Sequence, residues 1–122
     1  MNPAETVTAF IRAIERKDLD AALALVTSDV EYDNVPMSKV HGPDAIRTTL
    51  GPFLAGASAI EWIVHRQTAT GDVVMNERTD RFHMAKGWIE ITVVGVWELR
   101  GGKIALWRDY FDLASFTKQL QG

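Results

Sequence analysis

The sequence predicts an α+β fold in which helices lie on one face of a largely antiparallel sheet. Two observations lead to this prediction. The first half of the chain shows mostly helical periodicity, and the chain after residue 58 alternates apolar and polar residues in four long segments. Those segments are about a dozen residues long, above the usual five or six, so the sheet should curl strongly. We expect the helices to close its concave side into a cone with a ligand pocket inside.

Capping residues and apolar spacing define the elements before residue 59. In residues 3–16, Pro3 suits a first helical turn, and apolar side chains recur at i, i+3, i+4 and i+7. This apolar stripe consists of Val7, Phe10, Ile11 and Ile14. We then expect a short helix from Asp18 or Asp20 to residues 27–29, a strand over residues 30–35, and a third helix from Pro43 that breaks at Gly51-Pro52. Residues 53–58 are expected to form an apolar loop or an additional helical turn.

Four strands and a final helix complete the predicted chain. The strands are expected at residues 59–69, 72–83, 88–99 and 103–111. Their connections are short and contain glycine, as β-hairpin loops do. Asp112 is expected to cap a last helix from about Leu113 to Gln121. No linker or internal repeat interrupts the pattern, so we expect a single domain over residues 1–122.

Composition narrows the classes of function. The formal net charge of −3 argues against sequence-independent binding of nucleic acid, and the absence of cysteine excludes zinc ribbons, thiol nucleophiles and disulfides. His41, His65 and His83 show no metal-ligand spacing, so we expect no metal site. We find neither a signal-peptide pattern nor an apolar stretch long enough to span a bilayer. We therefore expect a cytoplasmic protein without a membrane partner.

A polar cluster is predicted on the inner face of the sheet. In a strand, Asn76, Arg78 and Asp80 project to the same side, and Phe82 follows them on that side. Alternation along the last strand points Asp109 into an aromatic setting that can face the same hollow. Arg78 would then bridge two carboxylates through its planar guanidinium, although an Arg–Asp pair by itself is more often structural than catalytic.

Tyr32 and Asn34 share one face of the strand over residues 30–35 and would add a phenol and an amide to this chamber. Such a group of side chains suits the addition of water to a strained ring. One aspartate, kept ionised by Arg78, would take a proton from a water molecule that Tyr32 and Asn34 hold. The other aspartate, kept protonated by burial and by its acidic neighbour, would give a proton to the leaving oxygen.

The motifs Tyr32-x-Asn34, Arg78-x-Asp80 and Trp107-Arg108-Asp109-Tyr110-Phe111-Asp112 resemble those of the limonene-1,2-epoxide hydrolase family, and the order of elements is similar over essentially the whole chain. The resemblance implies an NTF2-like, SnoaL-like cone with a mixed and strongly curved sheet, a homodimer and no cofactor. It implies that Asp109 is the base, Asp80 the acid, Arg78 the bridge, and Tyr32 and Asn34 the other groups that hold the water. It also implies a substrate pocket lined by Ile11, Ile14, Phe82, Ile91, Val93, Phe111 and Phe116.

We therefore expect an epoxide hydrolase that adds water directly to an apolar terpene, cyclic or aryl epoxide and releases a vicinal diol without a covalent intermediate. The nucleophile elbow and the catalytic histidine of α/β-hydrolase enzymes are absent from the sequence. Two alternatives remain open. One is a ketosteroid-isomerase-like or polyketide-cyclase-like enzyme on the same cone, and the other is a small-molecule-binding dimer whose charges are structural.

Overall fold

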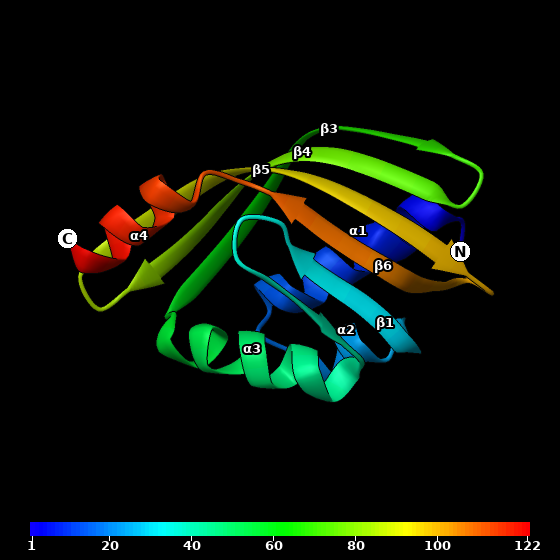
Figure 1. The fold of residues 1–122 in the computed structure, drawn as a ribbon, viewed down its shortest axis with the longest axis horizontal. Coiled ribbons are helices and arrows are strands. Elements are labelled where there is room, and N and C mark those ends of the chain that lie inside the picture. The colour runs from blue at the N-terminus through cyan, green and yellow to red at the C-terminus, as the bar shows by residue number, and fades with distance from the viewer.

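The structure, a computed structural model, describes residues 1–122 (Figure 1). Its helices are α1 (Pro3–Glu15), α2 (Leu19–Leu23), α3 (Pro43–Gly56) and α4 (Leu113–Gln121). At the start of α1, the Asn2 side chain accepts a hydrogen bond from the Glu5 backbone N–H, and the Glu5 carboxylate accepts one from the Asn2 N–H. Asp18 caps α2, and Asp112 caps α4 as predicted. None of the helices is both long and apolar enough to cross a membrane.

One mixed sheet contains all the strands, which are β1 (Val26–Asn34), β2 (Ser38–His41), β3 (Ala59–Thr70), β4 (Val73–Met84), β5 (Gly87–Arg100) and β6 (Lys103–Tyr110). Their order across the sheet is β2-β1-β6-β5-β4-β3. β1 runs parallel to β6, and every other neighbouring pair is antiparallel. The parallel pairing places the first strand of the chain beside the last one.

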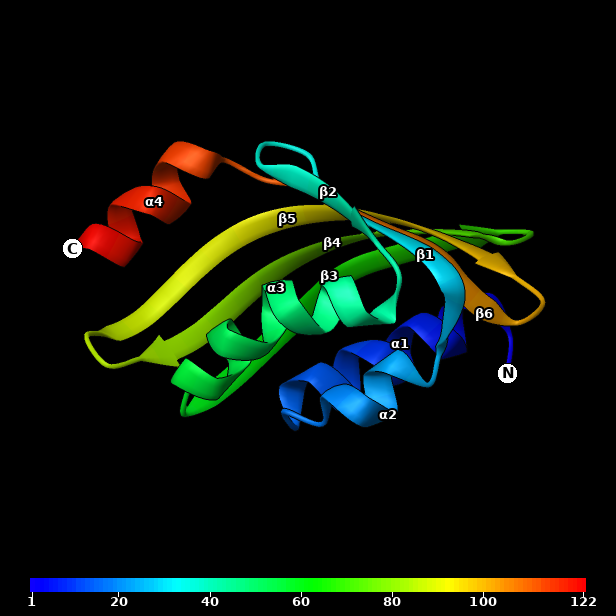
Figure 2. The same ribbon diagram turned by 60° about the horizontal axis from the view of Figure 1, so that its bottom comes forward.

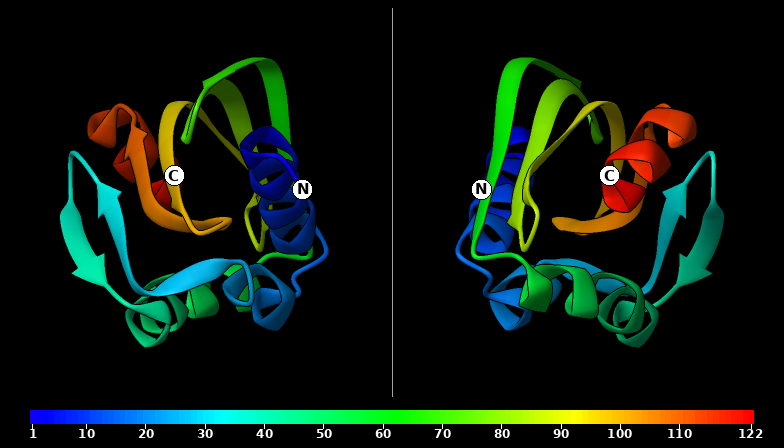
Figure 3. Two further views of the ribbon diagram at one scale, coloured as in Figure 1. Left: turned by 90° about the vertical axis from the view of Figure 1, so that its right-hand side faces the viewer. Right: turned by 90° about the vertical axis from the view of Figure 1, so that its left-hand side faces the viewer.

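The sheet curves strongly, and the first three helices lie on its concave side (Figure 2). In the end-on views, the β1–β2 hairpin and α1 stand on opposite sides of the interior, while α2 and α3 lie below it (Figure 3). The predicted stripe of α1 is buried in the core, where Phe10 contacts Trp97 and Trp107 edge-on at centroid distances of 5.5 and 5.0 Å. The α+β fold with a curved mixed sheet is thus confirmed.

Two predicted boundaries between residues 18 and 41 are wrong. α2 ends at Leu23 rather than at residues 27–29, and β1 begins at Val26. Val26 pairs with Ile104 of β6, so a long-range strand pairing outweighs the local helical pattern. The short strand β2 was not predicted, because its four residues are mostly exposed and show no apolar alternation.

The predicted break at Gly51-Pro52 is wrong, since α3 continues without interruption through Pro52 to Gly56, where an additional helical turn was one of the two expectations. Proline has no N–H to donate within the helix, and an interior proline typically costs about 3 kcal/mol or more. Ile46, Leu50 and Leu54 lie on both sides of Pro52, four residues apart, and all three are buried against the core. Burying one such side chain stabilises by about 1.5–3 kcal/mol, so their combined burial is large enough to offset that cost.

Candidate active site

Arg78, Asp80 and Asp109 meet on the concave face of the sheet. Arg78 and Asp80 lie on β4, and Asp109 lies on β6. The Nε and Nη2 atoms of Arg78 donate to the two carboxylate oxygens of Asp80, each at 3.0 Å. Nη2 also donates to Oδ2 of Asp109 at 3.1 Å. One guanidinium therefore bridges two carboxylates that come from different strands.

The bridged group is almost fully removed from solvent. Arg78 is 0% exposed, Asp80 3% and Asp109 4%. Charges at such depth require close partners, because desolvation is costly for an isolated ion. The Arg78 guanidinium also lies 5.2 Å from the ring centroid of Trp62 and 5.7 Å from that of Trp97, where the aromatic faces attract a cation.

One carboxylate oxygen of Asp109 is available to accept a hydrogen bond from a bound small molecule. The Oδ2 atom of Asp109 accepts from Arg78, whereas its buried Oδ1 has no hydrogen-bond partner of regular geometry within the chain, and the buried Trp107 Nε1–H acts on this carboxylate only as a weak donor. A buried carboxylate oxygen without a partner is costly, and a small polar molecule at this position would relieve that cost. Because Asp109 also lines an apolar cavity, Oδ1 can accept a proton from a water molecule bound there.

Both carboxyl groups have raised pKa values. Burial raises the pKa of Asp109 to about 6, with Arg78 opposing the rise and the Asp80 charge adding to it. Burial also raises the pKa of Asp80, again against the effect of Arg78, and the Glu15 charge contributes to the rise. Two interacting acids of this kind can hold one proton between them near neutral pH, which is what a paired acid and base require.

Tyr32 and Asn34 are brought to the bridged group by the parallel pairing of β1 with β6. In that register Tyr32 lies beside Trp107 and Asn34 beside Asp109. The Tyr32 ring stacks on Trp107 at a centroid distance of 3.9 Å and an interplanar angle of 13°. Burial and the nearby Asp109 charge raise the pKa of Tyr32 above its ordinary value, so its hydroxyl stays protonated as a hydrogen-bond donor.

A cavity of about 150 Å³ opens above this group, and most of the side chains that line it are apolar. Of the seven residues expected to line a substrate pocket, five line this cavity, namely Phe82, Ile91, Val93, Phe111 and Phe116. Ile11 and Ile14 do not line it. They are 2% and 0% exposed on the inward face of α1, where they pack in the main core, so that part of the expectation needs correction.

Further lining residues were not predicted, namely Met37, Thr49, Leu50, Phe53 and Trp62. The continuation of α3 past Pro52 explains Phe53, which contacts Phe82 edge-on at 4.7 Å. Trp62 follows Ile60 on the inner face of β3, so strand alternation alone could have predicted that Trp62 faces the interior. No group of three or more His, Cys, Asp or Glu side chains is arranged to hold a metal ion.

The chain is similar to known proteins in sequence and in fold. A family model described as the limonene-1,2-epoxide hydrolase catalytic domain matches residues 1–121. The chain is 36% identical over 114 residues to epoxide hydrolase EphG of Mycobacterium tuberculosis, covering 93% of this chain and 76% of that protein.

Solved structures give the same result. An LEH-like epoxide hydrolase of M. tuberculosis superimposes with a TM-score of 0.84 at 34% identity, covering 98% of this chain and 89% of that one. An NTF2-like protein of unknown function from Burkholderia pseudomallei superimposes with a TM-score of 0.87 at 21% identity, covering 100% and 99% of the two chains. The second likeness supports the fold alone.

Proposed function

The chain belongs to the limonene-1,2-epoxide hydrolase family and is an epoxide hydrolase, and we propose that it opens an apolar epoxide to a vicinal diol in one step. In this proposal Asp109 is the general base, Asp80 the general acid and Arg78 the bridge between them. Tyr32 and Asn34 hold the attacking water together with Asp109. The observation that best supports the proposal is the free Oδ1 of Asp109 at the cavity floor, next to an acid that shares its guanidinium.

The proposed reaction moves two protons. Water, held by Asp109, Tyr32 and Asn34, attacks a ring carbon while Asp109 Oδ1 accepts its proton. The ring C–O bond breaks as Asp80 gives its proton to the ring oxygen, which becomes the second hydroxyl. Arg78 contacts both acids throughout. Its positive charge stabilises the Asp109 carboxylate before the proton transfers and the Asp80 carboxylate after them.

The substrate class follows from the lining and volume of the cavity. Aromatic and aliphatic side chains dominate the wall, and polar groups gather at the floor. A cavity of about 150 Å³ matches a single small ring, such as a cyclic, aryl or monocyclic terpene epoxide, better than an extended chain. No residue of the proposed mechanism requires a cofactor.

Incubation with cyclohexene oxide, styrene oxide and limonene oxide tests this proposal. We expect diol from at least one of them, measured by gas chromatography against an enzyme-free control. In a single turnover in ¹⁸O-labelled water, one labelled oxygen should appear in the diol at once, because water attacks carbon directly. Label that enters the diol only from the second turnover would indicate an enzyme ester and contradict the one-step mechanism.

The proposed functional unit is a homodimer formed through the outer face of the sheet. Met75, Val94 and Tyr110 project from that face and are 47%, 45% and 45% exposed. Val94 pairs with Tyr110, and Met75 pairs with Val96, so the apolar side chains lie close together on β4, β5 and β6. A gathered apolar surface of this kind is typical of a protein interface.

A further inference from the structure

The Arg78 side chain has to cross one complete strand to reach its second carboxylate. β5 lies between β4, which contains Arg78, and β6, which contains Asp109. Neighbouring strands are about 4.8 Å apart, so the bridge spans about 10 Å across the sheet. In the register of the three strands, Asn76 of β4, Gly95 of β5 and Asp109 of β6 form one row. The guanidinium passes over the middle of this row.

Gly95 leaves the space through which the guanidinium passes. A Cβ atom at Gly95 would lie 2.4 Å from Arg78 Nη1, 2.7 Å from Asn76 Oδ1 and 2.9 Å from Trp97 Nε1. All three distances are shorter than the ordinary van der Waals contact of about 3.5 Å. Gly95 has none of the positive φ values found at the turn glycines, so its backbone does not require glycine. Space for Arg78 therefore accounts for a glycine inside a central strand, where glycine is otherwise unfavourable.

Asn76 fixes the edge of the guanidinium that faces away from both acids. Its Oδ1 accepts from Arg78 Nη1 at 2.9 Å and from Trp97 Nε1 at 3.3 Å. Its Nδ2 donates to Gln67 Oε1 at 3.0 Å, which keeps the amide oxygen turned toward Arg78. Asn76 is 3% exposed, so removing it would leave two buried donors without their acceptor.

We propose that Gly95 and Asn76 are positioning residues for epoxide opening, which together hold Arg78 across β5 so that it contacts Asp80 and Asp109 at the same time. Neither residue lines the cavity, so neither touches the substrate. Gly95 supplies room, and Asn76 supplies a fixed acceptor. The role in catalysis depends on the proposed function, whereas the effect on Arg78 and Asp109 does not.

Gly95→Ala tests the space requirement. The new methyl group displaces Nη1 by about 1 Å, and a shift of that size in a catalytic group can lower kcat about 100-fold. Asp109 then loses the cation that favours its ionised form, so its pKa rises. The acidic limb of the kcat/KM profile should move to higher pH. Gly51→Ala is the matched control, because a Cβ there lies 3.9 Å from Leu19 and meets no polar group.

Asn76→Ala tests the acceptor without adding any atoms. We expect kcat to fall about 10-fold, as for other partners that orient a catalytic group, while KM changes little because Asn76 does not line the cavity. Circular dichroism and thermal unfolding verify that each variant is folded. If Gly95→Ala does not fold, Asn76→Ala decides the proposal, and wild-type kcat in this variant would overturn it.

An NMR titration of the Asp109 carboxyl carbon separates this proposal from the proposed function. A higher Asp109 pKa in Gly95→Ala than in the wild type supports the positioning role even if the wild type makes no diol. A folded Gly95→Ala variant with the wild-type Asp109 pKa and the wild-type pH profile would overturn it. Equal losses of activity in Gly95→Ala and Gly51→Ala would overturn it as well.

Discussion

Asp109 is a buried acid with only one of its two oxygens in contact with a cation. When both acids are ionised, Arg78 faces two negative charges, so the buried group carries a net charge of −1. Removing that charge from solvent is unfavourable, and the raised pKa of Asp109 expresses this cost. Ionisation of the second acid is therefore unfavourable, which favours one proton shared by the two acids at the pH where a general base acts.

Asp109→Asn should abolish activity and stabilise the protein above pH 6. Removal of a general base typically lowers the rate about 10²- to 10⁴-fold. The folded-state pKa of Asp109 lies above that of the unfolded chain, so its contribution to stability is present at low pH and is lost as the pH rises through about 6. The neutral amide does not titrate, and we expect a gain of about 1–3 kcal/mol at pH 8.

Urea unfolding at pH 5 and pH 8 measures this gain, which should be larger at pH 8. Asp72→Asn, in the exposed turn between β3 and β4, is the control and should change neither activity nor the pH dependence of stability. Retained turnover in Asp109→Asn would remove Asp109 from the role of base. A stability difference that shrinks from pH 5 to pH 8 would contradict the direction of its pKa shift.

The site could be predicted from the sequence where the signal lies within one strand. Alternation groups Arg78 with Asp80, Tyr32 with Asn34, and Asp109 with its aromatic neighbours, and family resemblance adds the role of each. The functions of Asn76 and Gly95 depend on the register of three strands, which a single sequence does not fix. For the same reason, alternation predicts the correct face for Asn76 but no role for it, and it contains no signal for Gly95.

Helix α4 is attached to the sheet by few contacts. It has no buried residue, and its Gln119 side chain forms two hydrogen bonds with the Glu90 backbone. Its Phe116 contacts Phe53 and Phe111 and lines the cavity. A helix with few buried contacts opens more readily than the core, so α4 is the element best suited to admit substrate.

Gln119→Ala should raise KM about 3- to 10-fold and leave kcat unchanged. Two hydrogen bonds, each worth about 0.5–1.5 kcal/mol, are lost, while no proposed catalytic group lies on α4. Steady-state kinetics test the effect on KM, and faster hydrogen exchange of the α4 amides would support its cause. Thr117→Ala, an exposed change on the same helix, is the control. A fall in kcat at constant KM would contradict a role confined to substrate entry.

The ends of helices and strands can be predicted from this sequence where a turn residue or a capping residue marks them. Glycine-containing loops delimit β3 to β6 to within a few residues, and Asp112 marks the start of α4. The short strand β2 and the helix through Pro52 depend on tertiary contacts, since β2 pairs with β1 and α3 is anchored by buried residues on both sides of its proline. Local propensity contains no information about such contacts.

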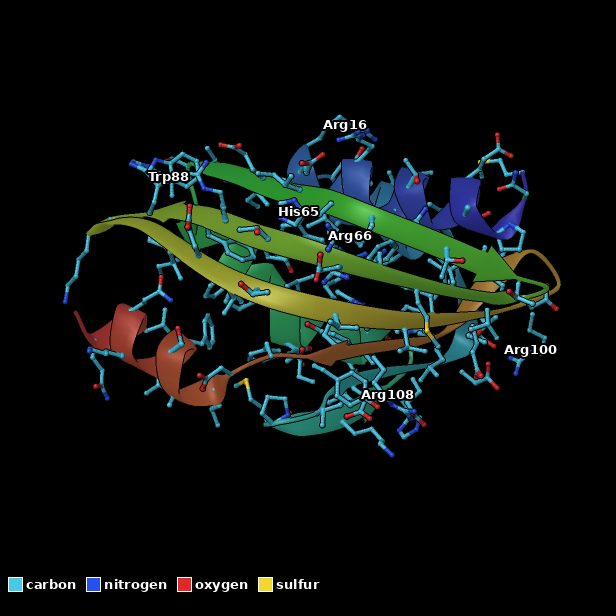
Figure 4. The ribbon with its side chains drawn as sticks, turned by 90° about the horizontal axis from the view of Figure 1, so that it is seen from above. Arg16, His65, Arg66, Trp88, Arg100 and Arg108 are labelled. Atoms are coloured by element: carbon cyan, nitrogen blue, oxygen red, sulfur yellow. The ribbon has the colours of Figure 1, made fainter.

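At the scale of the whole molecule, the two faces of the sheet differ in the side chains they carry. The inner face holds the buried charges, whereas the outer face, seen in Figure 4 with Arg66 and Arg108 labelled, mixes ion pairs with apolar side chains. Arg108 binds Asp33 and Glu31 of β1 there, each at 2.9 Å, which fastens the parallel strand pair that places Tyr32 and Asn34. The outer face thus supports the site without belonging to it.

Val94→Glu should convert a dimer into a monomer. A carboxylate in the middle of the apolar outer surface would have to be desolvated on association, which is costly. Light scattering coupled to size-exclusion chromatography should give twice the monomer mass for the wild type and the monomer mass for this variant. Lys86→Glu, in the β4–β5 loop, is the control and should remain dimeric. A monomeric wild type would contradict the proposed homodimer.

The floor of the cavity comes from β1, β4 and β6, while Thr49, Phe53 and Phe116 in its wall come from α3 and α4. Part of the cavity wall can therefore be changed without altering the strands that hold the polar group. Libraries that randomise helical wall positions would explore new substrate shapes while the proposed proton-transfer groups stay intact. The sheet would stay unchanged in such libraries, and only the helical residues at the cavity wall would vary.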